Sequence, residues 1–120
     1  MSRDYESLLP RVLATMFPDE GRRCEIVRKL SAYGTESFHH GRARVHLGIL
    51  KLAWLHPERL DEFIELACSD YRDLLCAAEY PLSSRDYRLK DQDPQKYREY
   101  QQEEMARYDA WLELVLSGGR

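Results

Sequence analysis

The spacing of apolar residues along the chain predicts helices almost throughout. Apolar side chains recur at intervals of three and four, the period at which residues share one face of an α-helix. Alternating runs of Val, Ile or Thr bounded by hairpin turns, which would indicate strands, are nearly absent. We therefore predict an all-α fold, a single-domain bundle of about five helices. Their approximate ranges are 7–17, 20–33, 42–55, 57–80 and 94–117.

Prolines mark where several of these helices begin or end. Pro10 would damage a helix interior, but it lies in the first turn if Ser7 is the N-cap, and there its missing N–H is not needed. Pro57 favours a helix start directly after His56, and Pro81 ends the same helix. We therefore expect one uninterrupted fourth helix between these two prolines.

The third helix carries apolar side chains on two opposite faces. One face holds Val45, Gly48, Ile49 and Leu52, and the roughly opposite face holds Leu47, Leu50 and Trp54. A helix that is apolar on two sides is usually buried between neighbours. We place it at the centre of the bundle, where Gly48 permits a close helix crossing and Leu50 and Trp54 are largely buried.

The fourth and fifth helices are each long enough to cross the whole domain. At 1.5 Å per residue, about 23 residues reach roughly 35 Å, which is about the diameter of a compact domain of this length. We expect the two helices to run side by side, with Phe63 and Leu74 in the core. The polar residues 82–93 are expected to form the only long loop of one domain that spans residues 1–120.

The composition indicates one globular domain and argues against several classes of partner. The 120 residues are 43% hydrophobic and 32% charged, with a net charge of −3, so nothing suggests nucleic acid or an anionic membrane as a partner. The connection between the second and third helices is also longer than that of a helix-turn-helix motif.

No apolar stretch approaches the roughly 20 residues that span a bilayer. The first ten residues, MSRDYESLLP, do not resemble a signal peptide, so we expect a cytoplasmic protein.

Four residues around the second connection have side chains that commonly bind metals: Glu36, His39, His40 and His46. Glu36 and His39 have the Glu-x-x-His spacing of carboxylate-bridged di-iron bundles, but those sites need a second such motif, which the chain lacks. A mononuclear site needs three or four converging ligands. We therefore expect no metal ion.

The three cysteines, Cys24, Cys68 and Cys76, do not form a disulfide framework. Cys68 and Cys76 would lie about 12 Å apart on one helix, beyond the reach of a disulfide. None has the flanking residues of a catalytic nucleophile. Because phosphate-loop and dinucleotide-binding motifs are absent as well, we expect no catalytic residues and no cofactor.

The last helix has an unusually aromatic face that includes Tyr97, Tyr100 and Tyr108. Tyrosines are large amphipathic side chains that are enriched at protein interfaces. We therefore favour a non-enzymatic interaction or binding protein, in which these tyrosines contact a protein partner or form a homodimer.

An enzyme or small-ligand binder is the alternative. Asp70 lies beside the apolar stripe of the fourth helix, where a carboxylate generally needs a partner. Arg42 or Arg44 of the third helix would supply it in an interhelical salt bridge, and a helix cap would serve as well. A ligand site would instead combine the segment 33–44 with the end of the fourth helix. Its candidate residues are His39, His40, Arg42, Asp70 and Tyr80.

Two stretches carry recognisable motifs: LSAYGTESFHHGRARVHLGILKLA at Leu30–Ala53, and DYRDLLCAAEYP at Asp70–Pro81. A Tyr-Gly-Thr-Glu turn precedes an Arg-Val-x-Leu-x-Ile-Leu-Lys-Leu helix, and a Tyr-Arg-Asp…Ala-Glu-Tyr-Pro helix end follows. In these motifs the chain resembles a group of small bacterial helical proteins for which no activity is established. The resemblance implies a bacterial source and one contiguous helical domain, and it carries over no catalytic residue. Residues 82–120 lie outside it.

Overall fold

The computed structural model describes residues 3–35 and 41–118, and in these residues it contains eight α-helices, one 3₁₀ turn and no strand. The all-α class is therefore confirmed, whereas the chain is divided into more helices than the five expected. The elements are α1 Tyr5–Met16, α2 Glu20–Leu30, α3 Arg42–Leu55, η1 Pro57–Arg59, α4 Leu60–Ser69, α5 Tyr71–Glu79, α6 Pro81–Arg85, α7 Leu89–Gln92 and α8 Pro94–Leu116.

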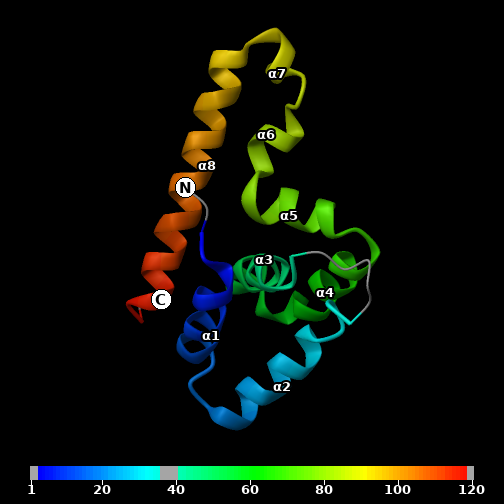
Figure 1. Cartoon of the computed structure of the whole chain (residues 1–120), viewed down its shortest axis with the longest axis vertical. Coiled ribbons are helices and arrows are strands. Elements are labelled where there is room, and N and C mark those ends of the chain that lie inside the picture. Colours follow the sequence, from blue (N-terminus) through cyan, green and yellow to red (C-terminus); the bar gives the residue numbers. More distant parts are fainter. Residues whose placement is uncertain (1–2, 36–40, 119–120) are drawn as a thin grey trace.

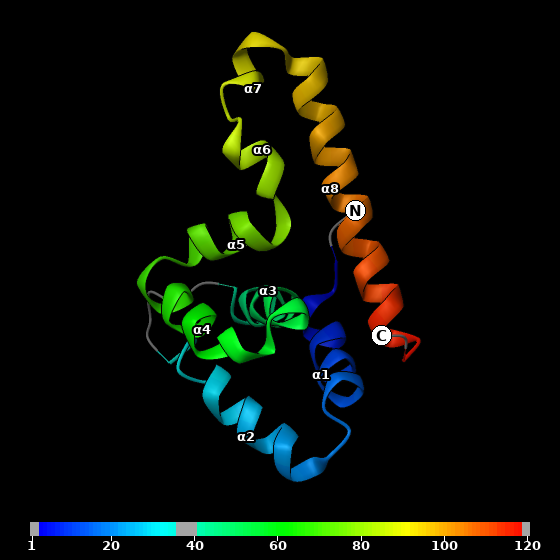
Figure 2. The same cartoon turned by 180° about the vertical axis from the view of Figure 1, so that it is seen from behind.

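The centre of the molecule is α3, as its two apolar faces predict. Eight of its fourteen residues are buried, and Leu47, Ile49 and Leu50 have no exposed surface. Helices α1, α4 and α5 pack around it, and Figures 1 and 2 show it in the middle of the lower part of the molecule. The remaining elements lie outside this four-helix centre.

Gly48 brings α5 unusually close to α3. A Cβ atom at this position would lie 3.0 Å from Cδ1 of Leu74 and 3.3 Å from Cβ of Ala78, both on α5. Such distances are shorter than ordinary van der Waals contact, so only glycine fits without a movement of the neighbouring helix. The expected close crossing at Gly48 is confirmed.

The expected fourth helix is broken, which corrects the prediction of one helix over 57–80. The residue Asp70 is extended, with φ −156° and ψ 91°, and its carboxylate accepts hydrogen bonds from the backbone N–H groups of Arg72 and Asp73. It therefore ends α4 and caps α5. The apolar stripe continues across the break, because both helices face α3, and so the pattern alone hides it. Among the helices of residues 3–35 and 41–118, α8 alone reaches 23 residues, so the expected pair of long helices side by side is not present there.

Two predicted helix ends also need correction. The first helix begins at Tyr5, because Asp4 is its N-cap and accepts hydrogen bonds from the backbone N–H and the hydroxyl of Ser7. Pro10 consequently lies inside α1 and not in its first turn. The second helix ends at Leu30, three residues earlier than expected.

The predicted core is largely confirmed. Leu50, Phe63 and Leu74 are buried, with at most 8% of their surface exposed. Trp54 is only half-buried at the edge of the core, which corrects its placement in the interior. The hydrophobic core thus thins out in the last turn of α3, where Ala53 is buried but Trp54 and Leu55 are not.

The segment 82–93 is helical and not the expected loop. The short helices α6 and α7 run beside the first half of α8 and form with it a projection, here called the arm (residues 81–103) (Figure 1). Its one buried residue is Ser83, and burial along α8 begins only at Glu104. The arm extends the molecule to 49 Å. Accordingly the radius of gyration, 14.9 Å, exceeds the value of about 13.6 Å for a compact chain of this length.

The close contact at Gly48 can be tested by substitution. Gly48→Val adds three carbon atoms against Leu74 and Ala78, so we expect the free energy of unfolding in urea to fall by about 1–3 kcal/mol. The matched control is Ala14→Val, which introduces the same side chain at an exposed position of α1 and should change the free energy by less than about 0.5 kcal/mol. Equal stabilities of the two variants would contradict the packing described here.

Candidate functional site

Of the residues predicted for a ligand site, the structure describes Arg42, Asp70 and Tyr80, and these three lie apart from one another. His39, His40 and Glu36 lie outside the described residues. Asp70 is exposed and caps the start of α5, whereas Tyr80 follows the end of the same helix. Ten residues at 1.5 Å each place their Cα atoms about 15 Å apart.

The remaining candidate, Arg42, is exposed at the start of α3, and its aliphatic stem covers Gly34. A Cβ atom on Gly34 would lie 2.7 Å from Cδ of Arg42, and Gly34 has a φ of +108°. The arginine therefore packs over a turn that requires glycine. This contact assigns the Arg42 stem a structural role.

The arginine of α3 that forms a salt bridge is Arg44, and its partner is Glu79 and not Asp70. The Glu79 carboxylate is 4% exposed, and both its oxygens accept hydrogen bonds from Arg44, with Nε to Oε2 at 2.9 Å. A buried carboxylate is tolerated only when it is paired in this way. The same pair raises the pKa of Arg44. Glu79 was missed in the sequence, although its place next to the apolar stripe of α5 is a usable signal.

A second buried carboxylate joins the arm to the body. Glu104 on α8 is 2% exposed, and its two oxygens accept the backbone N–H groups of Leu82 and Ser83, each at 3.0 Å. Both N–H groups belong to the first turn of α6. The N-cap residue of this helix, Tyr80, makes no capping hydrogen bond with its side chain. Glu104 therefore caps α6 from another helix. It fixes where the arm leaves the body.

Tyr108, one of the three predicted interface residues, lies inside the molecule. It is 1% exposed, and the guanidinium of Arg3 lies 4.2 Å from the centre of its ring. Burial raises the pKa of its hydroxyl group. Tyr108 therefore belongs to the protein's own core, which corrects its assignment to an exposed interface.

Lys51 of α3 faces the same region, with its Nζ atom 5.9 Å from the centre of the Tyr108 ring. Burial lowers the pKa of this amine, and the charges of Glu79 and Glu104 partly offset that effect. We call Arg44, Lys51, Glu79, Glu104 and Tyr108 the polar seam. Long polar side chains thus fill the space between α3, α5 and α8.

His46 has a structural role inside the molecule. It is 3% exposed, and its Nε2 lies 3.0 Å from the carbonyl oxygen of Tyr33. A carbonyl only accepts hydrogen bonds, so Nε2 carries the proton and donates it. Desolvation by burial lowers the pKa of this histidine, and the charge of Arg42 lowers it further. Within the described ranges, no three His, Cys, Asp or Glu residues are grouped so as to hold a metal ion.

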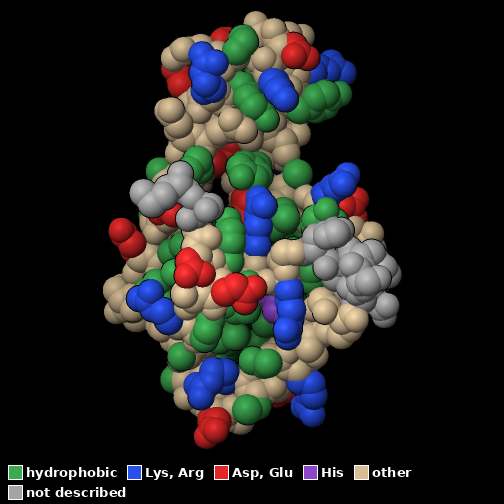
Figure 3. All heavy atoms as spheres, viewed as in Figure 1, with side chains coloured by type: hydrophobic (Ala, Val, Ile, Leu, Met, Phe, Trp, Pro, Cys, Tyr) green, Lys and Arg blue, Asp and Glu red, His purple; other side chains and the backbone are tan. Residues whose placement is uncertain are grey.

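The arm presents a mixed polar and aromatic surface. Tyr87 is 66% exposed, and Tyr97 and Tyr100 are half-buried. Five basic and five acidic side chains belong to the arm: Arg85, Arg88, Lys90, Lys96 and Arg98, and Asp86, Asp91, Asp93, Glu99 and Glu103. Figure 3 shows the arm as a narrow knob above the broader body, with apolar, basic and acidic side chains interspersed.

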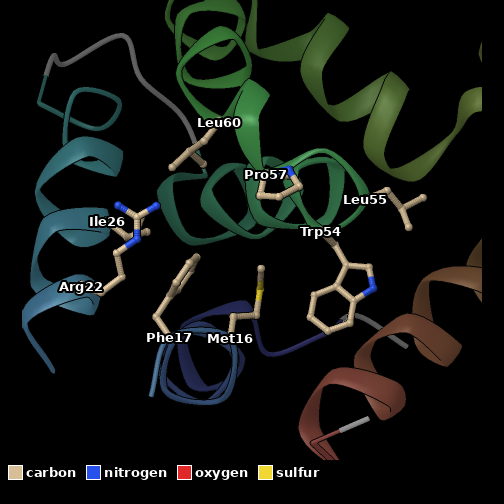
Figure 4. Close-up of a pocket in the computed structure, with 9 residues that line it drawn as sticks. Met16, Phe17, Arg22, Ile26, Trp54, Leu55, Pro57 and Leu60 are labelled. Atoms are coloured by element: carbon tan, nitrogen blue, oxygen red, sulfur yellow. The ribbon is translucent and has the colours of Figure 1, made fainter. Parts of the chain in front are cut away.

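An apolar pocket lies at the other end of the molecule, where the last turn of α3 faces α1 and α2. Its volume is about 410 Å³, and its lining comes from Met16, Phe17, Arg22, Ile26, Ala53, Trp54, Leu55, Pro57 and Leu60. The side chains surround it from α1, α2, α3 and the first residue of α4, and from the turn that starts η1 (Figure 4). Leu55 at this pocket is 76% exposed. No pattern in the sequence indicates this pocket, because its walls come from segments far apart in the chain.

Comparison with known proteins identifies no relative of this chain: no family model, no curated protein and no solved structure matches it. The resemblance to a group of small bacterial helical proteins therefore stays a prediction. Among the helices of the described residues, none is both long and apolar enough to span a membrane.

The cap on α6 can be tested with Glu104→Gln. Glutamine keeps the shape but has one acceptor oxygen in place of two, and it turns an NH₂ donor toward a backbone N–H. We expect amide hydrogens of residues 82–92 to exchange at least about tenfold faster, because a buried hydrogen bond to a charged group is lost. Amides of α3 should be unaffected. The control is Glu103→Gln, an exposed neighbour paired only with Arg107. Unchanged exchange in the arm of Glu104→Gln would disprove the cap.

His46 should make folding stability depend on pH. Because its pKa is lowered in the folded state, the unfolded chain binds more protons, and its contribution to stability is greatest above its ordinary pKa of 6.5. We expect this contribution to be lost as the pH falls below about 6.5. Urea unfolding between about pH 8 and about pH 5 should therefore show a smaller loss of stability for His46→Gln than for the wild type. His56→Gln, at an exposed position, should behave like the wild type.

Proposed function

We propose that this chain is a non-enzymatic interaction protein that uses its arm to associate, and that its partner is a second copy of the same chain. The observation that carries the proposal is the nearly complete absence of a core in the arm. Of its 23 residues, 81–103, Ser83 alone is buried.

Short helices gain their stability from packing, and the arm offers little of it. Helix α6 has five residues and α7 has four, far fewer than an isolated helix needs in water. Glu104 anchors one end of this structure, but the outward faces of Tyr87, Tyr97 and Tyr100 stay partly or largely exposed. Contact with a partner would bury these rings and supply the missing packing.

The charges of the arm favour a second copy as the partner. With five basic and five acidic side chains, the arm is neutral, so two identical arms do not repel one another. In a twofold dimer the same surface meets itself, and each positive group can face a negative group of the other chain. A strongly basic or acidic arm would instead favour a partner of the opposite charge.

The alternative of a ligand site at residues 33–44 and the end of the fourth helix has less support. Asp70 and Tyr80 lie at opposite ends of α5, and Asp70 is engaged as a helix cap. The two buried carboxylates are engaged as well, Glu79 by Arg44 and Glu104 by the backbone of α6. Their partners give both carboxylates structural roles, and the interaction function is the better supported of the two.

Light scattering of the purified chain tests the proposal. We expect a mass of twice 14.2 kDa at micromolar concentration. Tyr87→Glu should shift the equilibrium to the monomer, because Tyr87 is exposed and a new charge at a twofold contact faces its own copy. Leu114→Glu is the matched control, since Leu114 is 43% exposed on α8 outside the arm. It should leave the dimer intact.

A mass of 14.2 kDa at every concentration would refute the homodimer. Loss of the dimer in Leu114→Glu, with retention in Tyr87→Glu, would show that a dimer forms through another surface. Circular dichroism of both variants at equal concentration verifies that the helices are intact.

A further inference from the structure

The apolar pocket at the end of α3 lies far from the arm and has no part in the proposed association (Figures 1 and 4). We propose that it binds a small amphiphile: a compact apolar chain or ring system that ends in a carboxylate. In this complex the apolar body fills the pocket, and Arg22 pairs with the carboxylate.

The pocket has the size and the walls of a small-molecule site. Its volume of about 410 Å³ falls within the roughly 300–1,000 Å³ that is typical of ligand pockets. Its walls are held in place, because Arg23 donates hydrogen bonds to the carbonyl oxygens of Phe17 and Pro18, at 3.0 and 3.4 Å. These bonds fix the turn between α1 and α2. The backbone of Phe17 is therefore held in place by the protein itself.

The polarity of the lining selects the chemistry of the ligand. Arg22 is the one charged residue among the residues that line the pocket, and the others are apolar or aromatic. In Figure 4, Arg22 lies at one end of the pocket and Trp54 at the other, with Met16, Phe17 and Pro57 between them. A ligand that matches this arrangement is apolar along its length and negatively charged at one end.

Arg22 is able to exchange its present partner for a ligand. Its contact with Glu25 is a single one, Nη1 to Oε2 at 3.3 Å, and both side chains are about half exposed. Exposed ion pairs of this kind contribute little free energy. A ligand carboxylate would instead accept two parallel hydrogen bonds from the guanidinium. Its apolar body would add the burial of Phe17 and Trp54 surface, which the contact with Glu25 does not provide.

A nuclear magnetic resonance titration of the full chain tests this site with three probes of equal length: octanoate, 1-octanol and octylamine. The probes have eight carbon atoms each and differ in the charge of the head, and octanoate has the shortest apolar chain because its eighth carbon is the carboxyl carbon. We expect octanoate to bind most tightly and octylamine most weakly, and the amide shifts to change at residues around Phe17, Ile26 and Trp54. Equal affinities of octanoate and octanol would overturn the carboxylate assignment.

Arg22→Gln removes the charge and keeps much of the side-chain length. It should weaken octanoate binding about tenfold, as expected for the loss of hydrogen bonds to a charged group, and leave octanol binding unchanged. The matched control is Arg28→Gln, an exposed arginine of the same helix that does not line the pocket, and it should bind octanoate like the wild type. Equal loss in both variants would mean that octanoate responds only to the net charge of the surface.

Failure of this inference is distinguishable from failure of the proposed association. Tyr87→Glu should bind octanoate as the wild type does, whether or not the chain is a dimer. If none of the three probes shifts the pocket amides, the ligand site is refuted while the light-scattering result stands unaffected.

Discussion

The contact of α5 with α3 at Gly48 determines where the other elements can lie. Because there is no side chain at Gly48, Leu74 and Ala78 approach the α3 backbone directly, and α1 and α4 occupy other sides of the same helix. The long helix α8 then packs on α1 and on α5, α6 and α7, outside this centre. Towards the end of α8, Trp111, Leu112 and Val115 join the hydrophobic core. Nearer the middle of α8, the side chains of the polar seam lie between it and the centre.

The polar seam satisfies two buried carboxylates in two different ways. Glu79 is neutralised by the guanidinium of Arg44, which is an ion pair. Glu104 instead accepts two backbone N–H groups at the start of α6, where the partial positive charge of the helix end favours a carboxylate. The first interaction joins α3 to α5 within the body, and the second attaches the arm.

This division explains why the arm has a defined direction without a core. Two hydrogen bonds from Leu82 and Ser83 to Glu104 orient α6, although none of the apolar side chains of the arm is fully buried. A segment that is held at one end and poorly packed along its length is suited to contact another molecule. The partner supplies the missing packing, and the end held by Glu104 is already ordered before the partner binds.

The sequence predicted those parts of the fold that depend on local periodicity. The apolar faces around Leu47 and Leu50 predicted the central position of α3, and Gly48 predicted its close crossing. A cap was one of the roles expected for the Asp70 carboxylate, but the break there was missed, because the apolar stripe of α4 and α5 continues across it. The candidate site was harder, since Arg44 and Glu79 are 35 residues apart and Leu82 and Glu104 are 22 apart. Pairings at such separations depend on how the helices cross, which no local pattern records.

The pocket follows from the same feature that makes α3 the centre of the fold. The helix is apolar on two faces up to its last residues, and in its last turn Ala53 is still buried whereas Trp54 and Leu55 are not. After Leu55 the chain turns at once through His56 and Pro57 into η1, and Trp54 and Leu55 line the pocket together with residues of α1 and α2. Trp54 is consequently half-buried and Leu55 is 76% exposed. The neighbouring helices do not cover all the apolar side chains of α3, and those left at its end form one wall of a concave apolar surface. Arg22 adds a positive charge at one side of this surface.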